Sequence, residues 1–504
     1  MNFLKQLDKR YKTVLISVFM GLLLSHSMAL FNKISFHDDV YTLFDVGGTY
    51  SLGRWGLAFL REFVAFLFGA KNDTGFYSLP IMAGIYSFLF VGMSVCLIVK
   101  LMDIKNNLLC AALGLLFIST PYFASLFGYV FTASYYVFAL FLSIMGAYLI
   151  CYYKKWYSFL GGIFLILCSL SIYQAFYAFA LSLMLLYYIK ETLDEKGASW
   201  RIFFKRGLYY FTSIAIPLAL YLALTPIFCS ITGTSLSDYQ DINKMGNVDI
   251  PTYLNRIPYV YNNFLYLIKS IYRFSNIHIL YWVLLGLAVI LCMQKLWDIL
   301  KKDIKKAVQF FILLCFLPLA FDFTSLVVDR FNIHILMLYS QIMFMVLIAY
   351  LIEQTEFFEK ISYRLVVVCF SLIILMQIRT DNIFYLKAEI TQTRLISYFT
   401  TLVTRIKSTE GYKDEYPVAY INERSKRDFQ VKELSFRDYS VLPYKSTYAL
   451  LNSYAWRKFV ASWCGFTPRV VYGNFRDHPE VKEMPHYPDD GSIRLIDKVI
   501  VVKF

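Results

Sequence analysis

The amino-acid sequence predicts an α-helical membrane protein that crosses the bilayer many times and ends in a small α+β domain. Of its 504 residues, 58% are hydrophobic and only 17% are charged, and the mean hydropathy is +0.53. Apolar runs of about 20 residues, the length that crosses the hydrocarbon core, recur as far as residue 379. Beyond that point charges and short strand-like runs become frequent. A soluble protein of this size would not carry such repeated runs.

The apolar runs predict about eleven transmembrane helices. The first run contains His26 and is not clearly followed by a small-residue cleavage site, so we expect a retained helix and not a removed signal peptide. The expected spans are 13–31, 79–100, 108–127, 129–152, 157–172, 173–189, 207–228, 277–295, 306–324, 331–352 and 361–379.

The loops between the spans alternate in charge, which predicts the orientation of the chain. One set of short loops carries 20 of the 49 lysine and arginine residues, whereas the other set, although longer in total, carries 9. The positive-inside rule therefore puts the N-terminus in the cytoplasm, and an odd number of spans puts residues 380–504 outside. The net charge of +14 fits attraction to anionic lipid and phosphate-bearing substrates. We expect no nucleic-acid partner, because no compact basic patch with a nucleic-acid motif is present.

The loop after the first span begins with Phe36-His37-Asp38-Asp39-Val40. Two adjacent carboxylates at a membrane surface are costly to desolvate unless a function uses them. Their mutual repulsion favours a raised pKa for one of them, which suits a base. Two such acids also bind Mg²⁺ or Mn²⁺ weakly, so metal dependence stays open, and no zinc-site spacing is present. The alternatives are solvated loop acids or helix N-caps, and a lone histidine such as His37 is more often structural than a phosphate ligand.

The same loop predicts a helix that lies on the membrane surface. From Arg54 to about Phe68, aromatic residues recur at helical spacing in a stretch too short and too charged to span. Arg54 and Arg61 are seven residues apart, so two helical turns place them on one face, where they would bind a lipid-linked phosphate. The alternative for both is a place among lipid headgroups; the Gly-Arg-Trp-Gly turn favours function for Arg54.

Further polar residues lie near the predicted outer surface. Ser171-Ile172-Tyr173-Gln174-Ala175 stands between two spans. Gln174 bonds either a sugar hydroxyl or another helix, and Tyr173 either stacks on a sugar ring or belongs to an aromatic belt. Arg330, at the mouth of a span, either binds phosphate or snorkels to headgroups. A second external loop predicts another surface helix over about 251–274.

We expect two domains, a membrane domain over residues 1–379 and an external domain over residues 380–504. The tail predicts a helix over about 381–407 and strands over about 418–421, 470–472 and 499–504. About 125 residues suffice for a small α+β domain. No nucleophile elbow, phosphate loop or metal spacing occurs there, so we expect it to cap the membrane site or hold the acceptor. Cys229 and Cys464 would both lie outside the membrane, so a disulfide between them stays an open alternative. Two isolated cysteines are weak evidence for it.

Three motifs, in this order, resemble the Gtr-type family of bacterial membrane glucosyltransferases, the group that includes serotype-converting O-antigen glucosyltransferases. They are Asp38-Asp39 after the first span, Gly53-Arg54-Trp55 in the same loop, and Ser171-Ile172-Tyr173-Gln174-Ala175. The plan of many spans and an external C-terminal segment also matches, so the resemblance covers most of the chain. That family is similar to the wider GT-C class.

The resemblance implies an inverting transfer from a polyprenyl-phosphate sugar, such as undecaprenyl-phosphate glucose, to a hydroxyl of a surface polysaccharide such as the O-antigen of lipopolysaccharide. The reaction would take place on the external face of the bacterial cytoplasmic (inner) membrane. That the sugar is glucose comes only from the resemblance. A partner glycosyltransferase would make the donor in the cytoplasm, and a flippase would move it across.

The resemblance also implies roles for single residues. In GT-C enzymes the first acid of such a pair usually acts as the base, so Asp38 would take the acceptor proton and Asp39 would orient the acceptor or share a cation. The candidates for binding the donor phosphate are Arg54, Arg61, Arg330 and His37. The candidates for binding the sugar or the acceptor are Trp55, Tyr173 and Gln174.

The main alternative is a transporter or flippase of lipid-linked glycans. Transporters carry ionisable residues at mid-membrane, broken helices and internal repeats. Here the middles of the expected spans are almost free of charge, no repeat is evident, and the acids and arginines gather at one surface. These features favour the enzyme. A non-catalytic scaffold for cell-wall assembly that binds glycan through the C-terminal domain is a third interpretation.

Overall fold

The computed structural model describes residues 7–43, 48–67, 77–195, 197, 199–238, 250–270, 277–328, 334–354, 359–422, 450–451 and 454–504. These residues form two compact units. The first, the helical unit, comprises the described residues of 1–32 and 46–383. The second, the C-terminal unit, comprises those of 33–45, 384–436 and 447–504. The start of the first loop therefore groups with the end of the chain.

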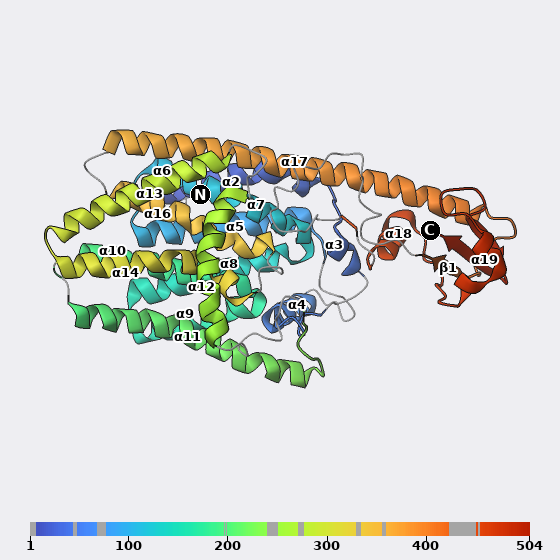
Figure 1. The fold of residues 1–504 in the computed structure, drawn as a ribbon, viewed down its shortest axis with the longest axis horizontal. Coiled ribbons are helices and arrows are strands. Elements are labelled where there is room, and N and C mark those ends of the chain that lie inside the picture. The colour runs from blue at the N-terminus through green and yellow to red at the C-terminus, as the bar shows by residue number, and fades with distance from the viewer. Residues whose placement is uncertain are drawn as a thin grey trace. The chain divides into compact units, whose positions relative to one another are not determined.

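The helical unit is built of helices that lie side by side (Figure 1). Its longer helices are α2 (Lys9–Phe31), α5 (Pro80–Met102), α6 (Asn107–Ile118), α8 (Val130–Tyr153), α9 (Trp156–Ile172), α10 (Tyr177–Asp194), α11 (Trp200–Ile231), α13 (Ile277–Leu300), α14 (Ile304–Phe321) and α16 (Met343–Glu353). Short helices connect them: α7 (Pro121–Ala124), η1 (Ser125–Tyr129), η2 (Gln174–Phe176), α15 (Phe323–Val327) and η4 (Ile335–Ile342). Helices are present at both places where the sequence predicts a helix on the membrane surface, as α4 (Trp55–Leu67) and α12 (Ile250–Ser270); the structure holds no membrane, so their surface location stays a prediction.

The helices confirm a membrane protein with many spans. Within the described residues, nine helical stretches are long and apolar enough to cross a bilayer. The difference from the eleven predicted spans lies in two places. The stretch Asn107–Tyr153 contains two predicted spans, 108–127 and 129–152, and the apolar helix Trp156–Ile172 has only 17 residues. A helix of 17 residues lies at the short end of the range for a span.

Small residues let the membrane helices approach closely. A Cβ atom on Gly146 of α8 would lie 2.8 Å from the carbonyl oxygen of Gly162 of α9, and a Cβ on Gly162 would lie 2.7 Å from the carbonyl oxygen of Gly146. The two backbones therefore meet where neither residue carries a side chain. In a bilayer, where lipid tails are as apolar as leucine, such close packing is a main source of helix association.

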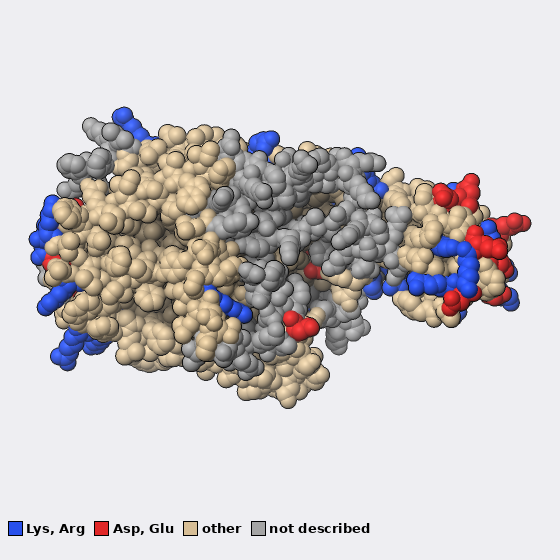
Figure 2. Space-filling model, in the orientation of Figure 1, with Lys and Arg blue, Asp and Glu red and all other residues tan. Residues whose placement is uncertain are grey.

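The outer surface of the helical unit matches a lipid environment. Large apolar side chains such as Phe204, Leu208 and Phe211 of α11 are more than 60% exposed. Figure 2 shows that the described surface along the helices is almost uncharged, whereas lysine and arginine gather at one end of them. Exposed lysines at 154–155, after α8, and at 301–302, between α13 and α14, belong to loops that the sequence assigns to the cytoplasm.

The last span and the predicted tail helix are one helix, α17, which runs from Glu359 to Lys407 (Figure 1). The sequence predicts a break near Arg379, where apolar residues give way to charged ones. The structure shows none there, because the 49 residues contain no glycine or proline that would end the helix. The change in composition marks a change of surroundings and not of backbone conformation.

The C-terminal unit contains a small sheet with strand order β1-β3-β2, built from β1 (Val418–Ile421), β2 (Ile493–Ile496) and β3 (Val499–Lys503). β1 pairs with β3 in parallel and β2 pairs with β3 antiparallel. The expected strands at 418–421 and 499–504 are confirmed, and the expected strand at 470–472 is reduced to a single bridge between Val470 and Val418. β2 was not expected.

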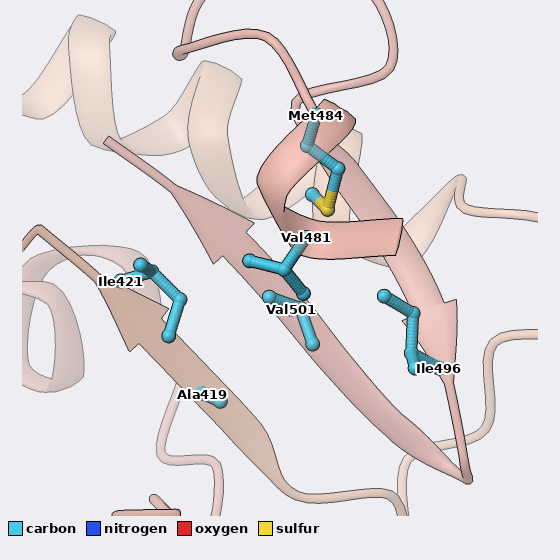
Figure 3. Close-up of a cluster of buried hydrophobic side chains, with 6 residues drawn as sticks. All are labelled: Ala419, Ile421, Val481, Met484, Ile496 and Val501. Carbon is cyan, nitrogen blue, oxygen red and sulfur yellow. The ribbon is translucent and has the colours of Figure 1, made fainter. Parts of the chain in front are cut away.

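The sheet is completed by α18 (Trp456–Cys464), η6 (Phe475–Asp477) and α19 (Pro479–Glu483). Figure 3 shows Val481 and Met484, at the end of α19, directed toward Val501 of the central strand. Together with Ala419, Ile421 and Ile496 they form a buried apolar cluster. The Nζ of Lys503 donates to the carbonyl oxygens of Val481, Lys482 and Met484, which fixes this segment on the sheet.

All nine cysteines are free thiols. The thiol of Cys229 donates to the carbonyl oxygen of Tyr50 at 3.5 Å, and Cys464 Sγ lies 3.8 Å from Thr400 Oγ1. Cys229 belongs to the helical unit and Cys464 to the C-terminal unit.

Candidate functional site

Two of the three sequence motifs meet in the helical unit. A Cβ atom on Gly56, in the first turn of α4, would lie 2.0 Å from Ser171 Oγ and 3.1 Å from the backbone carbon of Ser171, at the end of α9. No residue larger than glycine fits there without moving α9. The Gly-Arg-Trp-Gly turn and the Ser171–Ala175 segment, which are more than a hundred residues apart in the chain, therefore form one contact.

Hydrogen bonds hold the turn before α4. Gln174 Nε2 donates to the carbonyl oxygen of Leu52 and to the hydroxyl of Tyr221, both at 2.8 Å. Tyr221 in turn donates to the carbonyl oxygen of Gly53 at 3.0 Å. Gly53 has a φ of +67°, and a Cβ there would lie 2.4 Å from the Tyr221 oxygen. Glycine is required both by the left-handed conformation and by this close approach.

Arg54 lies against two stacked tyrosine rings. Its Nη1 donates to the hydroxyl of Tyr136 at 2.9 Å, and its guanidinium carbon lies 5.2 Å from the centre of the Tyr173 ring. The rings of Tyr136 and Tyr173 stack at 4.3 Å. Tyr173 is only 4% exposed. The π-faces and the hydroxyl hold the guanidinium in one orientation, which preorganises it for an anion.

The two other candidates of this loop have different surroundings. Trp55 is buried, stacks on Phe228 of α11 at 4.7 Å and donates from Nε1 to Thr225 Oγ1 at 3.3 Å, so it anchors α4 on α11. Arg61 pairs with its neighbour Glu62 at 3.4 Å. Arg54 directly precedes α4 and Arg61 lies within it, so only Arg61 belongs to the predicted helix itself.

The acidic pair belongs to the C-terminal unit. Asp38 and Asp39 lie in the short helix α3 (His37–Tyr41), which packs against α18. Asp38 is half-buried and accepts a hydrogen bond at Oδ1 from the hydroxyl of Tyr454. Asp39 is buried, with 1% exposure. The two carboxylates therefore have different surroundings although they are adjacent in the chain.

The segment before α3 is fixed on α17. The side-chain amide of Gln392 accepts from the backbone N–H of Ser35 at 2.6 Å and donates to the carbonyl oxygen of Lys33 at 2.7 Å. The ring of Phe36, 2% exposed, stacks on Phe384 at 5.7 Å. The hydrogen bonds of Gln392 and the stacking of Phe36 on Phe384 thus hold the start of α3 against α17.

The remaining candidates are only partly described. Arg330 lies outside the described residues, and of His37 only the backbone, at the start of α3, is described. Among the residues that the structure describes, no three His, Cys, Asp or Glu side chains come together as a group able to hold a metal ion.

A second buried carboxylate, Asp322, was not expected. It follows α14, is 1% exposed, and accepts hydrogen bonds from Asn263 of α12 at 2.7 Å and from Ser325 of α15 at 2.8 Å. Burial of a carboxylate is costly, and these hydrogen bonds offset part of that cost. An acid directly at the end of an apolar run is the signal that could have drawn attention to it. Tyr454 and Gln392 carry no comparable signal in the sequence.

One comparison with known proteins found a match. The family described as glucosyl transferase GtrII matches residues 27–345, more than half of the chain, and this region includes the acidic pair, Arg54 and Gln174. No match was found among curated proteins or among solved structures. The chain belongs to the glucosyl transferase GtrII family.

Proposed function

We propose that this glucosyltransferase moves glucose from a polyprenyl phosphate to a hydroxyl group of a bacterial surface polysaccharide such as O-antigen, with inversion, on the external face of the cytoplasmic membrane. The observation that carries the proposal is Arg54. It is a guanidinium held by a tyrosine hydroxyl and two ring faces, in a turn that joins the two motifs of the helical unit. A lipid-linked phosphate is the anionic substrate that such a site suits in a membrane protein.

The protein has to stabilise the charge of the leaving phosphate and to take the proton of the acceptor hydroxyl. The acceptor oxygen attacks the anomeric carbon of glucose while the bond from that carbon to the phosphate oxygen breaks, so that the polyprenyl phosphate leaves with one more negative charge. Arg54 stabilises this charge. The proton of the acceptor hydroxyl passes to Asp38, which acts as the general base. Asp39 orients the acceptor, and Tyr173 and Gln174 shape the donor site around Arg54.

The orientation follows from the positive-inside rule. Exposed lysines at 154–155 and 301–302 stay in the cytoplasm, so the N-terminus lies inside and the C-terminal unit outside. The donor reaches this side through a separate flippase after its synthesis by a cytoplasmic glycosyltransferase.

Transfer from radiolabelled polyprenyl-phosphate glucose to purified polysaccharide tests the proposal. Wild-type protein should transfer the label, and Asp38→Asn should lose at least about a hundredfold in kcat because a general base contributes that much or more. Donor binding should persist in the variant. Asp477→Asn, an exposed acid of the same unit, is the matched control and should keep full activity.

Two results would contradict the proposal. If wild-type protein transfers sugar from none of several polyprenyl-phosphate donors, yet moves them across proteoliposomes, the chain transports lipid-linked glycans. If Asp38→Asn keeps full activity, Asp38 is not the base.

A further inference from the structure

The hydroxyl of Tyr454 donates a hydrogen bond to the Oδ1 atom of Asp38. The two residues are 416 positions apart in the chain and belong to the same compact unit. Tyr454 also lies outside residues 27–345, the part of the chain that matches the family. A segment beyond the matched region thus contacts the proposed base directly.

A second contact fixes the tyrosine ring. Tyr41 lies three residues after Asp38, so both side chains project from the same side of α3. The rings of Tyr41 and Tyr454 meet edge to face, with centres 5.8 Å apart and planes at 89°. Edge-to-face pairs of this kind are favourable beyond their area of contact. The ring contact therefore sets the position from which the Tyr454 hydroxyl reaches the carboxylate.

We propose that Tyr454 is a positioning residue, which orients the carboxylate of Asp38 for transfer of the acceptor proton. The inference rests on the proposed function, in which Asp38 is the general base. A carboxylate rotates easily about its last side-chain bond, and a base works only when a lone pair points at the proton that it takes. A phenol is a neutral donor near pH 7, so it fixes this rotation without adding a charge that would compete with the acceptor.

A purely structural role makes a different prediction. Tyr454 is 48% exposed, so its ring contributes only part of its area to the folded core. Phenylalanine keeps this ring and its contact with Tyr41 and removes only the hydroxyl. A structural tyrosine should therefore tolerate the change, whereas a positioning tyrosine should not.

The test compares Tyr454→Phe with wild-type protein in the transfer assay with polyprenyl-phosphate glucose. We expect kcat to fall about tenfold, because the carboxylate spends less time in the productive orientation, while KM for the donor stays within about twofold. Tyr472→Phe is the matched control: Tyr472 is 81% exposed in the same unit and should keep both constants. Unchanged melting temperatures in both variants would show that folding is not affected.

A second comparison keeps the inference falsifiable. In Asp38→Glu the carboxylate lies one methylene further from the backbone, so the bond to Tyr454 is already disturbed. Adding Tyr454→Phe to this variant should then lower kcat less than twofold. A full tenfold loss in that background, or wild-type kcat for Tyr454→Phe alone, would overturn the inference.

The outcomes separate this inference from the proposed function. If Asp38→Asn is inactive and Tyr454→Phe has wild-type kcat, the base assignment stands and only the role of Tyr454 fails. If Asp38→Asn is fully active, the base assignment itself fails, and with it the reason for a positioning residue.

Discussion

Arg54 combines a charge with an orientation. Its guanidinium is held by one hydroxyl and two ring faces, and a lysine ammonium can reproduce the charge but neither the planar fork nor the stacking. The planar, fixed orientation of the Arg54 side chain therefore matters more than its positive charge alone.

Arg54→Lys should raise KM for polyprenyl-phosphate glucose by about tenfold and lower kcat as well, because the phosphate loses a bidentate partner and the leaving group loses its stabilisation. Steady-state transfer kinetics measure both constants. Arg457→Lys is the matched control, since Arg457 also lies over a tyrosine ring, that of Tyr472, but in the C-terminal unit. If Arg54→Lys and wild-type protein have equal kcat and KM, Arg54 does not bind the donor phosphate.

At the scale of elements, the contact between α4 and the end of α9 has no spare volume. Gly56→Ala places a methyl group 2.0 Å from Ser171 Oγ and 3.1 Å from the Ser171 backbone carbon. Overpacking of this kind typically costs about 1–3 kcal/mol. We expect a lower melting temperature and a reduced rate of transfer, because Arg54 directly precedes α4.

Gly286→Ala is the matched control for this change. Gly286 lies in α13, and a Cβ atom there would meet nothing within 4 Å. Alanine also has the higher helix propensity, so this variant should be at least as stable as wild type. If the two variants melt alike, α4 does not contact α9 as closely as described.

Local patterns predicted most elements and missed where one of them ends. Helical spacing of aromatic residues predicted α4, and a short strand-like run predicted β1, because each pattern reports on neighbours close in the chain. The pattern near Arg379 led to a helix end that does not exist, because charge reports on the surroundings of a backbone and not on its hydrogen bonds. The two-residue turn of the β2–β3 hairpin, Asp497-Lys498, has φ of +48° and +61° without glycine, so the usual signal was missing.

At the scale of the whole molecule, the charge of the loops predicts the topology. Alkaline phosphatase, which is active only outside the cytoplasm, should be active when fused after Phe504, and green fluorescent protein at the same position should be dark. Fusions after Lys302, between α13 and α14, should give the opposite result. Fluorescence from the fusion at Phe504 would place the C-terminal unit inside and contradict the proposed side of the reaction.

The candidate site could be predicted only in part. Motifs pointed to Asp38, Arg54 and Gln174, because charged and polar residues near apolar spans stand out in a sequence. The partners of these residues could not be predicted, since Tyr136, Tyr221 and Tyr454 are ordinary tyrosines in a chain that has 41 of them. Only the folded chain shows that residues 33–45, at the start of the first loop, group with residues from 384 onward.

The bond between Asp38 and Tyr454 also has a consequence for biosynthesis. A ribosome adds about 5–20 residues per second, so roughly 20–80 s pass between the synthesis of the two residues, which are 416 positions apart. During this time the helices of the first unit enter the membrane one after another, while α3 still lacks α17 and α18. The nascent chain therefore holds its acidic pair without the partners that position it. On the proposed function, a chain that ends before α17 and α18 lacks the contacts that position Asp38, so it should transfer sugar more slowly than the finished protein.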